Sequence, residues 1–301
     1  MANSHGTGEC SKSDGQEQFV TKLLKTRDGG WLRGGMFLEM GGGDGIKQSN
    51  TFALESCLGW HGILIEPNPH LSKRICTNRP RALSYSLAVS LTCNRSAVNA
   101  TCSQGTMAFD VSSKIIAGRL TESWTTAGDP SLLNAEMKLM HSKAFKVDHL
   151  CVPCAPLRSL LSLVPHIDYL SLDLEGAEAV VLQTIDWTRL SVHVLGVEQS
   201  SHAIEKNAAV RDQLRTQGFV HVFTHWAWKY HVGNELFVNG SYLRRNLRQV
   251  AEAVDPMARM GNLSWVGGGE GNRRQRHAAV ETLINIMRKR ARRVQLYGNR
   301  T

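Results

Sequence analysis

The sequence predicts an α/β protein with a doubly wound, mainly parallel sheet. Short apolar runs rich in Leu, Ile and Val alternate along the chain with segments whose apolar residues have helical spacing. Such runs are typical of strands buried on both faces, and their alternation with helices is typical of parallel sheets. A glycine-rich turn after the first strand-like run adds to this prediction, because doubly wound folds bind nucleotide-like ligands at that position.

The elements follow from the apolar pattern in chain order. A short amphipathic helix is expected within residues 15–30, where a Gly-Gly pair ends the pattern. Strands are expected at residues 36–40, 62–66, 84–90, 167–173, 192–198, 219–224 and 235–238. Helices are expected at residues 49–58, 157–163, 177–185 and 203–217. Residues 91–150 begin rich in Ser, Thr and Asn and are expected to form a long insertion or loop, followed by a helix near 132–141.

Charge separates the body of the chain from its end. Residues 1–239 hold 22 basic and 22 acidic side chains, whereas the last 62 residues hold 13 basic and 4 acidic ones and carry the whole net charge of +9. The expected segments are a polar stretch at 1–18, a domain at 19–239 and a basic tail at 240–301. A glycine linker at 267–269 and a basic amphipathic helix at 275–294 are expected in the tail. The tail either attaches to an anionic partner, nucleic acid or a lipid surface, or docks on the domain as a solvated extension.

Cysteine content and hydropathy bear on the compartment. The chain has no apolar stretch of the roughly 20 residues that a membrane-spanning helix needs, and its first 18 residues lack the apolar run of a secretory signal. Seven cysteines in 301 residues are too few for a disulfide scaffold. We therefore expect a reducing, cytoplasmic location, with the secretory pathway as the alternative if the N-terminus is truncated. Cys151 and Cys154 form a lone C-x-x-C without convincing further zinc ligands, and both are expected to be structural.

The turn after the first expected strand reads Gly41-Gly42-Gly43-Asp44-Gly45. Glycine is needed where the backbone has positive φ or where a ligand lies against bare backbone. The next strand ends in Glu66, about 20 residues on, where a carboxylate can accept hydrogen bonds from both ribose hydroxyls. Glu39 inside the first strand would repel a pyrophosphate, and Ile46 occupies the place of the third glycine of a dinucleotide fingerprint. The pattern therefore favours a ligand with a cationic group, such as S-adenosylmethionine, over NAD.

Several strings of residues resemble the FkbM-type methyltransferase family. They are FLEMGGGDG at 37–45, SNT at 49–51, LGWHG at 58–62, IEPNP at 65–69 and IDYLSLDLEGAE at 167–178. Further likeness is found at 196–198, 218–219 and 235–238. The resemblance spans residues 19–238, with 91–150 poorly matched, and does not cover the tail.

The resemblance implies a class I methyltransferase fold, Rossmann-like, with seven strands of which the last is antiparallel. It also implies S-adenosylmethionine as methyl donor and an oxygen of a sugar, polyketide or similar metabolite as the usual acceptor. The matching donor-binding residues are Glu39, Gly41, Gly43 and Asp44 in the turn and Glu66 at the ribose. Asp173 and Glu175 match the acidic pair after the family's fourth strand. Gly42-Gly43 replaces the more usual Ala-Asn, which removes side-chain contacts to the donor.

Candidate catalytic residues lie near the carboxyl ends of later strands. Asp173 and Glu175 lie on the same side of the chain by strand alternation, and they could accept the acceptor's proton or bind a divalent cation. In the alternative interpretation Glu175 only caps the following helix. His225 is a candidate base within an aromatic segment at 224–231, which either contacts a ring-shaped acceptor or simply closes the sheet edge. No residue is assigned as a metal ligand.

The function predicted first is O-methylation of a sugar or small-molecule hydroxyl. A nucleic-acid methyltransferase anchored by the basic tail is the first alternative, and it predicts activity that falls steeply with salt. A non-catalytic binding or trafficking module is the second, because a fold does not guarantee its chemistry. Affinity for S-adenosylmethionine separates the two enzymes from the module.

Overall fold

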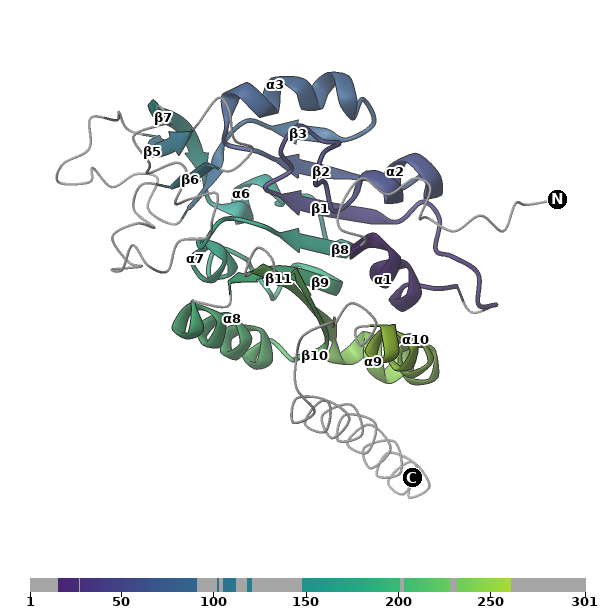
Figure 1. Ribbon diagram of the computed structural model, residues 1–301. Helices are drawn as coiled ribbons and strands as arrows, with labels where there is room; N and C mark the ends of the chain where they lie inside the picture. The colour runs from purple at the N-terminus through teal and green to yellow at the C-terminus, as the bar shows by residue number, and fades with distance from the viewer. Residues whose placement is uncertain are drawn as a thin grey trace.

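The computed structural model describes residues 16–26, 28–90, 102, 105–111, 118–120, 148–200, 203–227 and 232–260. Its centre is a seven-stranded sheet in the order β10-β11-β9-β8-β1-β2-β3 (Figure 1). The strands are β1 Met36–Met40, β2 His61–Ile65, β3 Leu83–Tyr85, β8 His166–Leu172, β9 Ser191–Ser200, β10 Phe219–Ala227 and β11 Val232–Asn239. Only β11 runs antiparallel to its neighbours, β9 and β10. The prediction of a class I methyltransferase sheet with an antiparallel last strand is confirmed.

Helices cover both faces of this sheet, as the doubly wound prediction requires. The helices are α1 Gln16–Leu23, α2 Phe52–Leu58, α3 Pro69–Asn78, α6 Leu157–Leu160, α7 Glu178–Leu182, α8 Ile204–Thr216, α9 Gly240–Arg245 and α10 Leu247–Met260. One buried cluster joins α1, α2, α3, α9 and α10 to one face of the sheet, and a second joins α6, α7 and α8 to the other. Phe37 enters the first cluster and Leu38 the second, because successive strand residues point to opposite faces.

Part of the basic tail belongs to this folded body. Tyr242, Leu243, Val250 and Val254 are buried in the same cluster as α1, and the Tyr242 hydroxyl donates a hydrogen bond to the Leu23 carbonyl at 3.1 Å. The first part of the expected tail is therefore two packed helices, because α10 has an apolar face in spite of the high net charge of the tail. The predicted linker at 267–269 and helix at 275–294 lie outside the described residues.

A second, smaller sheet occupies part of the segment expected to be a loop. It has the order β4-β7-β5-β6, with β4 Ala88–Val89, β5 Thr106–Val111, β6 Gly118–Leu120 and β7 Asp148–Ala155. Ala88, Met107, Phe109 and Val152 form its own small core. In Figure 1 this sheet lies on the side toward which β1 and β2 run. The helix expected near 132–141 lies outside the described residues.

Disulfides correct the expectation drawn from the cysteines. Cys102 is bonded to Cys151, with their Cα atoms 5.4 Å apart, and Cys57 and Cys154 are also disulfide-bonded. Cys76 is an exposed free thiol. The cysteines of the C-x-x-C are structural, as predicted, but their pairing is typical of an oxidising rather than a reducing compartment. Within the described residues, no helix combines the length and the apolar character needed to cross a membrane.

Candidate active site

The glycine turn leaves the end of β1 and passes directly beside β8. Gly41, Gly43 and Gly45 have φ angles of 83°, 55° and 83°, in the left-handed region that favours glycine. A Cβ atom added to Gly41 would lie 1.9 Å from the carbonyl oxygen of Asp173. The first residue after β1 is thus packed against the first residue after β8, with no room for a side chain between them.

Glu66 lies directly after β2 and holds the same turn. Its side chain is buried, and its two carboxylate oxygens accept hydrogen bonds from the backbone N–H of Gly43 at 2.9 Å and of Asn68 at 2.7 Å. Burial raises the pKa of Glu66 to about 8, against the lowering effect of these two hydrogen bonds, and the nearby carboxyl groups of Asp173 and Glu39 raise it further. A carboxylate at this place can accept hydrogen bonds from two adjacent hydroxyls as well.

Glu39 of β1 and Asp44 of the turn both accept hydrogen bonds from the loop that follows the turn. The fully buried carboxylate of Glu39 accepts from the Ser49 hydroxyl at 2.8 Å, the Asn50 N–H at 2.6 Å and the Thr51 hydroxyl at 2.5 Å. Asp44 accepts from the N–H groups two and three residues further along the chain. Both predicted donor-binding acids therefore shape the backbone around the donor turn.

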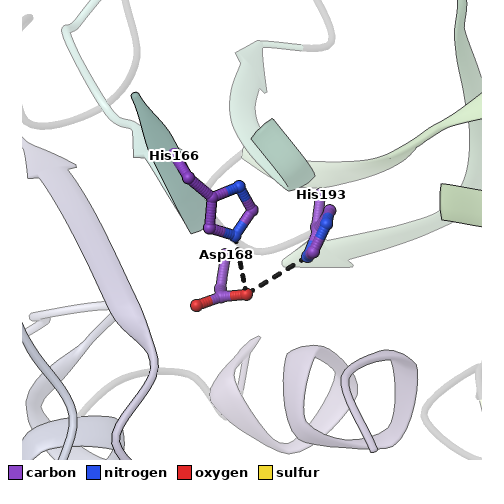
Figure 2. A group of neighbouring side chains, drawn as sticks. All are labelled: His166, Asp168 and His193. Atoms are coloured by element: carbon purple, nitrogen blue, oxygen red, sulfur yellow. Dashed lines mark hydrogen bonds and ion pairs between the residues drawn. The ribbon is translucent and has the colours of Figure 1, made fainter. Parts of the chain in front are cut away.

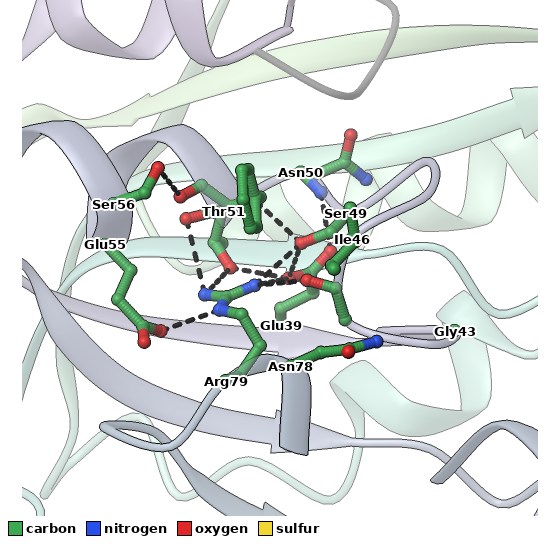
Figure 3. A network of polar contacts seen from close by, with 12 residues as sticks. Glu39, Gly43, Ile46, Ser49, Asn50, Thr51, Glu55, Ser56, Asn78 and Arg79 are labelled. Carbon is green, nitrogen blue, oxygen red and sulfur yellow. Dashed lines mark hydrogen bonds and ion pairs between the residues drawn. The ribbon is translucent and has the colours of Figure 1, made fainter. Parts of the chain in front are cut away.

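Arg79 closes this network from the end of α3, as Figure 3 shows. Its guanidinium is buried and donates to Glu55 at 2.7 Å, to the Ser49 hydroxyl at 2.9 Å and to the Thr51 hydroxyl at 3.0 Å. It also donates to the carbonyl of Gly45 at 3.1 Å and lies 3.9 Å from Glu39. One buried cation thus connects the glycine turn, the Ser49–Thr51 loop and α2.

Two carboxyl groups meet at the carboxyl ends of β8 and β9. Asp173 follows β8, Glu198 is near the end of β9, and a carboxylate oxygen of one lies within 4.8 Å of a carboxylate oxygen of the other. Burial is the largest cause that raises the pKa of both groups, to about 6 for Asp173 and well above the usual range for Glu198, and each carboxyl group repels charge on its neighbours. The pair can therefore share one proton near neutral pH.

Glu175 joins these two acids, and the ligand oxygens of all three lie within 4.8 Å of one another. This arrangement could hold a divalent cation. The backbone of Glu175 has φ of 52°, which is uncommon for a non-glycine residue. Glu178, rather than Glu175, accepts from the N–H groups of Leu174 and Gly176 before α7, both at 3.1 Å. These two hydrogen bonds hold the loop that leads into α7, and no side chain caps the first turn of that helix.

His225 lies on β10, at the same edge of the sheet but further away. The strand register pairs Glu198 with Asn234 and Asn234 with His225, so these residues form one row across three strands. With strands about 4.8 Å apart, His225 is about 10 Å from Glu198 along the row. Its ring lies 5.6 Å from that of Phe19 on α1. Residues 228–231 of the predicted aromatic segment lie outside the described residues.

The sequence of the chain matches the model of a known protein family. The profile of the methyltransferase FkbM domain matches residues 39–221, more than half of the chain. The chain belongs to the FkbM methyltransferase family. It is accordingly an S-adenosylmethionine-dependent methyltransferase. Among curated proteins, none matches this FkbM methyltransferase significantly.

Solved structures resemble this FkbM methyltransferase only at low identity. A TehB-like S-adenosylmethionine-dependent methyltransferase from Corynebacterium glutamicum is 10% identical, with 73% of this chain and 87% of that chain covered and a TM-score of 0.36. Aeropyrum pernix fibrillarin with natively bound S-adenosyl-L-methionine is 10% identical, with 74% of each chain covered and a TM-score of 0.37. The human methyltransferase 10 domain containing protein is 8% identical, with 80% and 85% covered and a TM-score of 0.38. Scores this low carry no information about the substrate.

The edge of the sheet suits the methyl donor chemically. S-adenosylmethionine carries a ribose and two cationic groups, a sulfonium and an ammonium. Glu66 offers a carboxylate beside the bare backbone of the glycine turn, and Asp173 and Glu198 place further negative charge at the same edge. A cationic ligand would oppose both burial and mutual repulsion, which together raise the pKa values of these acids. In this FkbM methyltransferase the residues present therefore fit the donor.

Sequence reasoning missed three contributors to the site. Glu198 pairs with Asp173, Arg79 holds the glycine turn, and Lys206 forms a 2.8 Å ion pair with the buried Glu178. Glu198 could have been found, because it lies at the carboxyl end of the expected strand next in the chain after that of Asp173. Arg79 follows α3 and carries no local signal, since its partners, from Glu55 to Glu39, are 24 to 40 residues away in sequence.

Proposed function

We propose that this FkbM methyltransferase transfers a methyl group to a hydroxyl of a sugar or sugar-like small molecule. The observation that carries the proposal is the contact between the two halves of the site: the carbonyl of Asp173 lies against Gly41 of the donor turn. Asp173 and Glu198 are therefore next to any donor held by that turn. A carboxyl group beside the donor can take the proton that methylation of a hydroxyl has to remove.

The residues divide the work of the reaction. S-adenosylmethionine supplies, when bound, an electrophilic methyl group on a sulfonium. Glu66 would hold the ribose, and the N–H groups and bare Cα atoms of the glycine turn would hold the remainder of the donor. Asp173 would accept a hydrogen bond from the acceptor hydroxyl and take its proton as the new C–O bond forms and the methyl–sulfur bond breaks, with Glu198 sharing that proton. The donor would leave as the neutral thioether S-adenosylhomocysteine. His225 and Asn234 are further along the same row and would contact the acceptor away from the reacting hydroxyl.

The charge at this edge favours a neutral, hydroxyl-rich acceptor over nucleic acid. Asp173, Glu175 and Glu198 lie together there, and they would repel phosphates. Lys206, whose charge acts on Asp173, is already paired with Glu178. Carboxylates in such clusters are suited to accept hydrogen bonds from sugar hydroxyls. A divalent cation between the three acids would serve the same acceptor by binding its hydroxyl oxygen.

The proposal is tested by methyl transfer from labelled S-adenosylmethionine to a panel of glycans and sugars, with RNA and DNA as competing acceptors. We expect label in the sugar panel and loss of turnover in Asp173→Asn, with donor binding retained. Asp212→Asn, an exposed surface change on α8, is the matched control. Label found only in RNA or DNA would show that the protein is a nucleic-acid methyltransferase instead. Absence of donor binding by the wild-type protein would leave only the binding-module alternative.

The same assay tests for a metal. A chelator leaves turnover unchanged if Asp173 and Glu198 act by themselves, and added Mg²⁺ restores turnover if a cation between the three acids is needed.

We also propose that the chain matures in an oxidising compartment, because disulfides such as Cys102–Cys151 persist there. Counting the free thiols of the protein taken from cells tests this proposal, and a full set of reduced cysteines would contradict it.

A further inference from the structure

Two histidines and an aspartate converge at the edge of the sheet opposite the active site. His166 Nε2 lies 3.0 Å from Asp168 Oδ1, and His193 Nδ1 lies 3.1 Å from the same oxygen. Figure 2 shows the two imidazole rings directed at one side of the carboxylate. The three ligand atoms all lie within 4.8 Å of one another.

The sheet itself produces this grouping. His166 and Asp168 are two residues apart at the start of β8 and therefore point to the same face. The parallel register pairs Ile167 with Val192 and Tyr169 with Val194, which puts His193 beside Asp168. Asp168 precedes Asp173 by five residues, which is about 16 Å along an extended strand. The group is therefore separate from the catalytic edge.

We propose that His166, Asp168 and His193 form a binding site for Zn²⁺, with at least one coordination position open to solvent or to an external ligand. Zinc prefers imidazole nitrogen and carboxylate oxygen in tetrahedral geometry at about 2.0–2.2 Å. Two ligands of one tetrahedral ion are then about 3.4 Å apart. The observed separations of 3.0 and 3.1 Å need to widen by only a few tenths of an ångström.

The surroundings of the group are those of a supported metal site. The other carboxylate oxygen of Asp168 accepts a hydrogen bond from the backbone N–H of Met36 at 2.9 Å, which fixes the orientation in which Oδ1 meets the two rings. Such outer hydrogen bonds normally orient ligands in metal sites. The ring of Tyr242 packs on His193 with 4.4 Å between centroids. The side chains of His166, Asp168 and His193 are 36%, 14% and 22% exposed, so an ion can enter without unfolding.

Without metal, the same three residues form a hydrogen-bonded cluster in which both rings donate to one oxygen. Zinc would take the place of the two hydrogen-bonding protons, and each imidazole would then carry its remaining proton on the other ring nitrogen. The ion would thereby join the first residues of β8 and β9. Because it binds only the folded chain, it would also raise the midpoint of thermal unfolding.

The test is a calorimetric titration of the full chain, free of any polyhistidine tag, with Zn²⁺ as the probe and Mg²⁺ as the comparison. We expect Zn²⁺ binding that weakens at least about 100-fold in His193→Gln, since even outer contacts change metal affinity by about 10–100-fold. His70→Gln, at an exposed histidine on α3, is the matched control and should bind as the wild type does.

Two further measurements keep the test decisive. His166→Gln removes the most exposed of the three ligands and provides a second variant if His193→Gln folds poorly. Co²⁺ in place of Zn²⁺ should give the visible absorption of a tetrahedral site, and both histidine variants should lose it. Equal Zn²⁺ affinity in the wild type and the two histidine variants, or no Zn²⁺ binding by the wild type, would overturn the proposal.

Discussion

Replacing Arg79 by methionine should destabilise this enzyme more than any exposed charge change. The guanidinium is 1% exposed and touches two acids, Glu55 at 2.7 Å and Glu39 at 3.9 Å, which are themselves almost fully buried. It also donates to Gly45, Ser49 and Thr51 around the donor turn. A methionine side chain at this position would fill part of the same space but would leave those carboxylates without their cation.

The expected cost follows from the burial of the acids. Removing one partner of a buried ion pair costs about 3–5 kcal/mol, because the remaining charge is uncompensated. At roughly 2–4 °C per kcal/mol for a large domain, the midpoint of thermal unfolding should fall by about 10 °C. Arg79→Lys keeps the charge but loses the planar set of donors, and it should give an intermediate loss.

The assay is urea unfolding followed by tryptophan fluorescence, with S-adenosylmethionine binding measured at a temperature where every variant is folded. Arg215→Met is the matched control, because its ion pair with Asp212 is exposed at both ends, 78% and 71%, and exposed pairs contribute little. We expect Arg79→Met also to weaken donor binding, since the glycine turn loses its support. A loss in Arg79→Met no larger than in Arg215→Met would refute the reasoning.

Four further outcomes are expected. Glu66→Gln should weaken S-adenosylmethionine binding in a calorimetric titration by removing a ribose acceptor. The pKa of Glu66 is raised from 4.5 to about 8, so its contribution to stability should be fully present below pH 4.5 and lost as pH rises to about 8. In urea unfolding without donor, Glu66→Gln should therefore lack this decrease of the unfolding free energy with pH. Asp173→Asn should lower kcat about 10²–10⁴-fold at unchanged donor affinity. The kcat of the wild type should rise as pH increases through about 6, the pKa of Asp173. If Asp173→Asn shows the same pH profile as the wild type, Asp173 is not the base. Replacing Cys102 and Cys151 together by serine should cost about 4 kcal/mol of unfolding free energy, from a sequence separation of 49, whereas Cys76→Ser should be nearly neutral.

Local patterns in the sequence predicted the elements that build the donor site. The expected first strand at 36–40 coincides with β1, and the glycine turn and Glu66 lie where the pattern places them. Buried strands of a parallel sheet have to be continuous apolar runs, and a turn with positive φ has to contain glycine. Such requirements act on neighbouring residues and can therefore be recognised without knowledge of the rest of the chain.

Contacts between residues that are far apart in sequence could not be predicted from these local patterns. Arg79 lies directly after α3 and meets Glu55 on α2, 24 residues away in sequence, and no local pattern marks that pair. The pairing of Cys102 with Cys151 was missed for the same reason. The four-stranded sheet at 88–155 has strands as short as two or three residues, too short to give a periodic signal.

By itself, the sequence determined the fold class, the positions of the strands, turn and acid that build the donor site, and the preference for a cationic methyl donor. Those properties depend on apolar periodicity, on glycine at positive φ and on one acid at the end of a strand, all of which are short-range. Only the tertiary structure decided that Glu39 holds a loop, that Asp173 shares its environment with Glu198, and that His166, Asp168 and His193 meet. Each of these depends on the sheet register and on burial, which set distances and pKa values between residues that the chain order keeps apart.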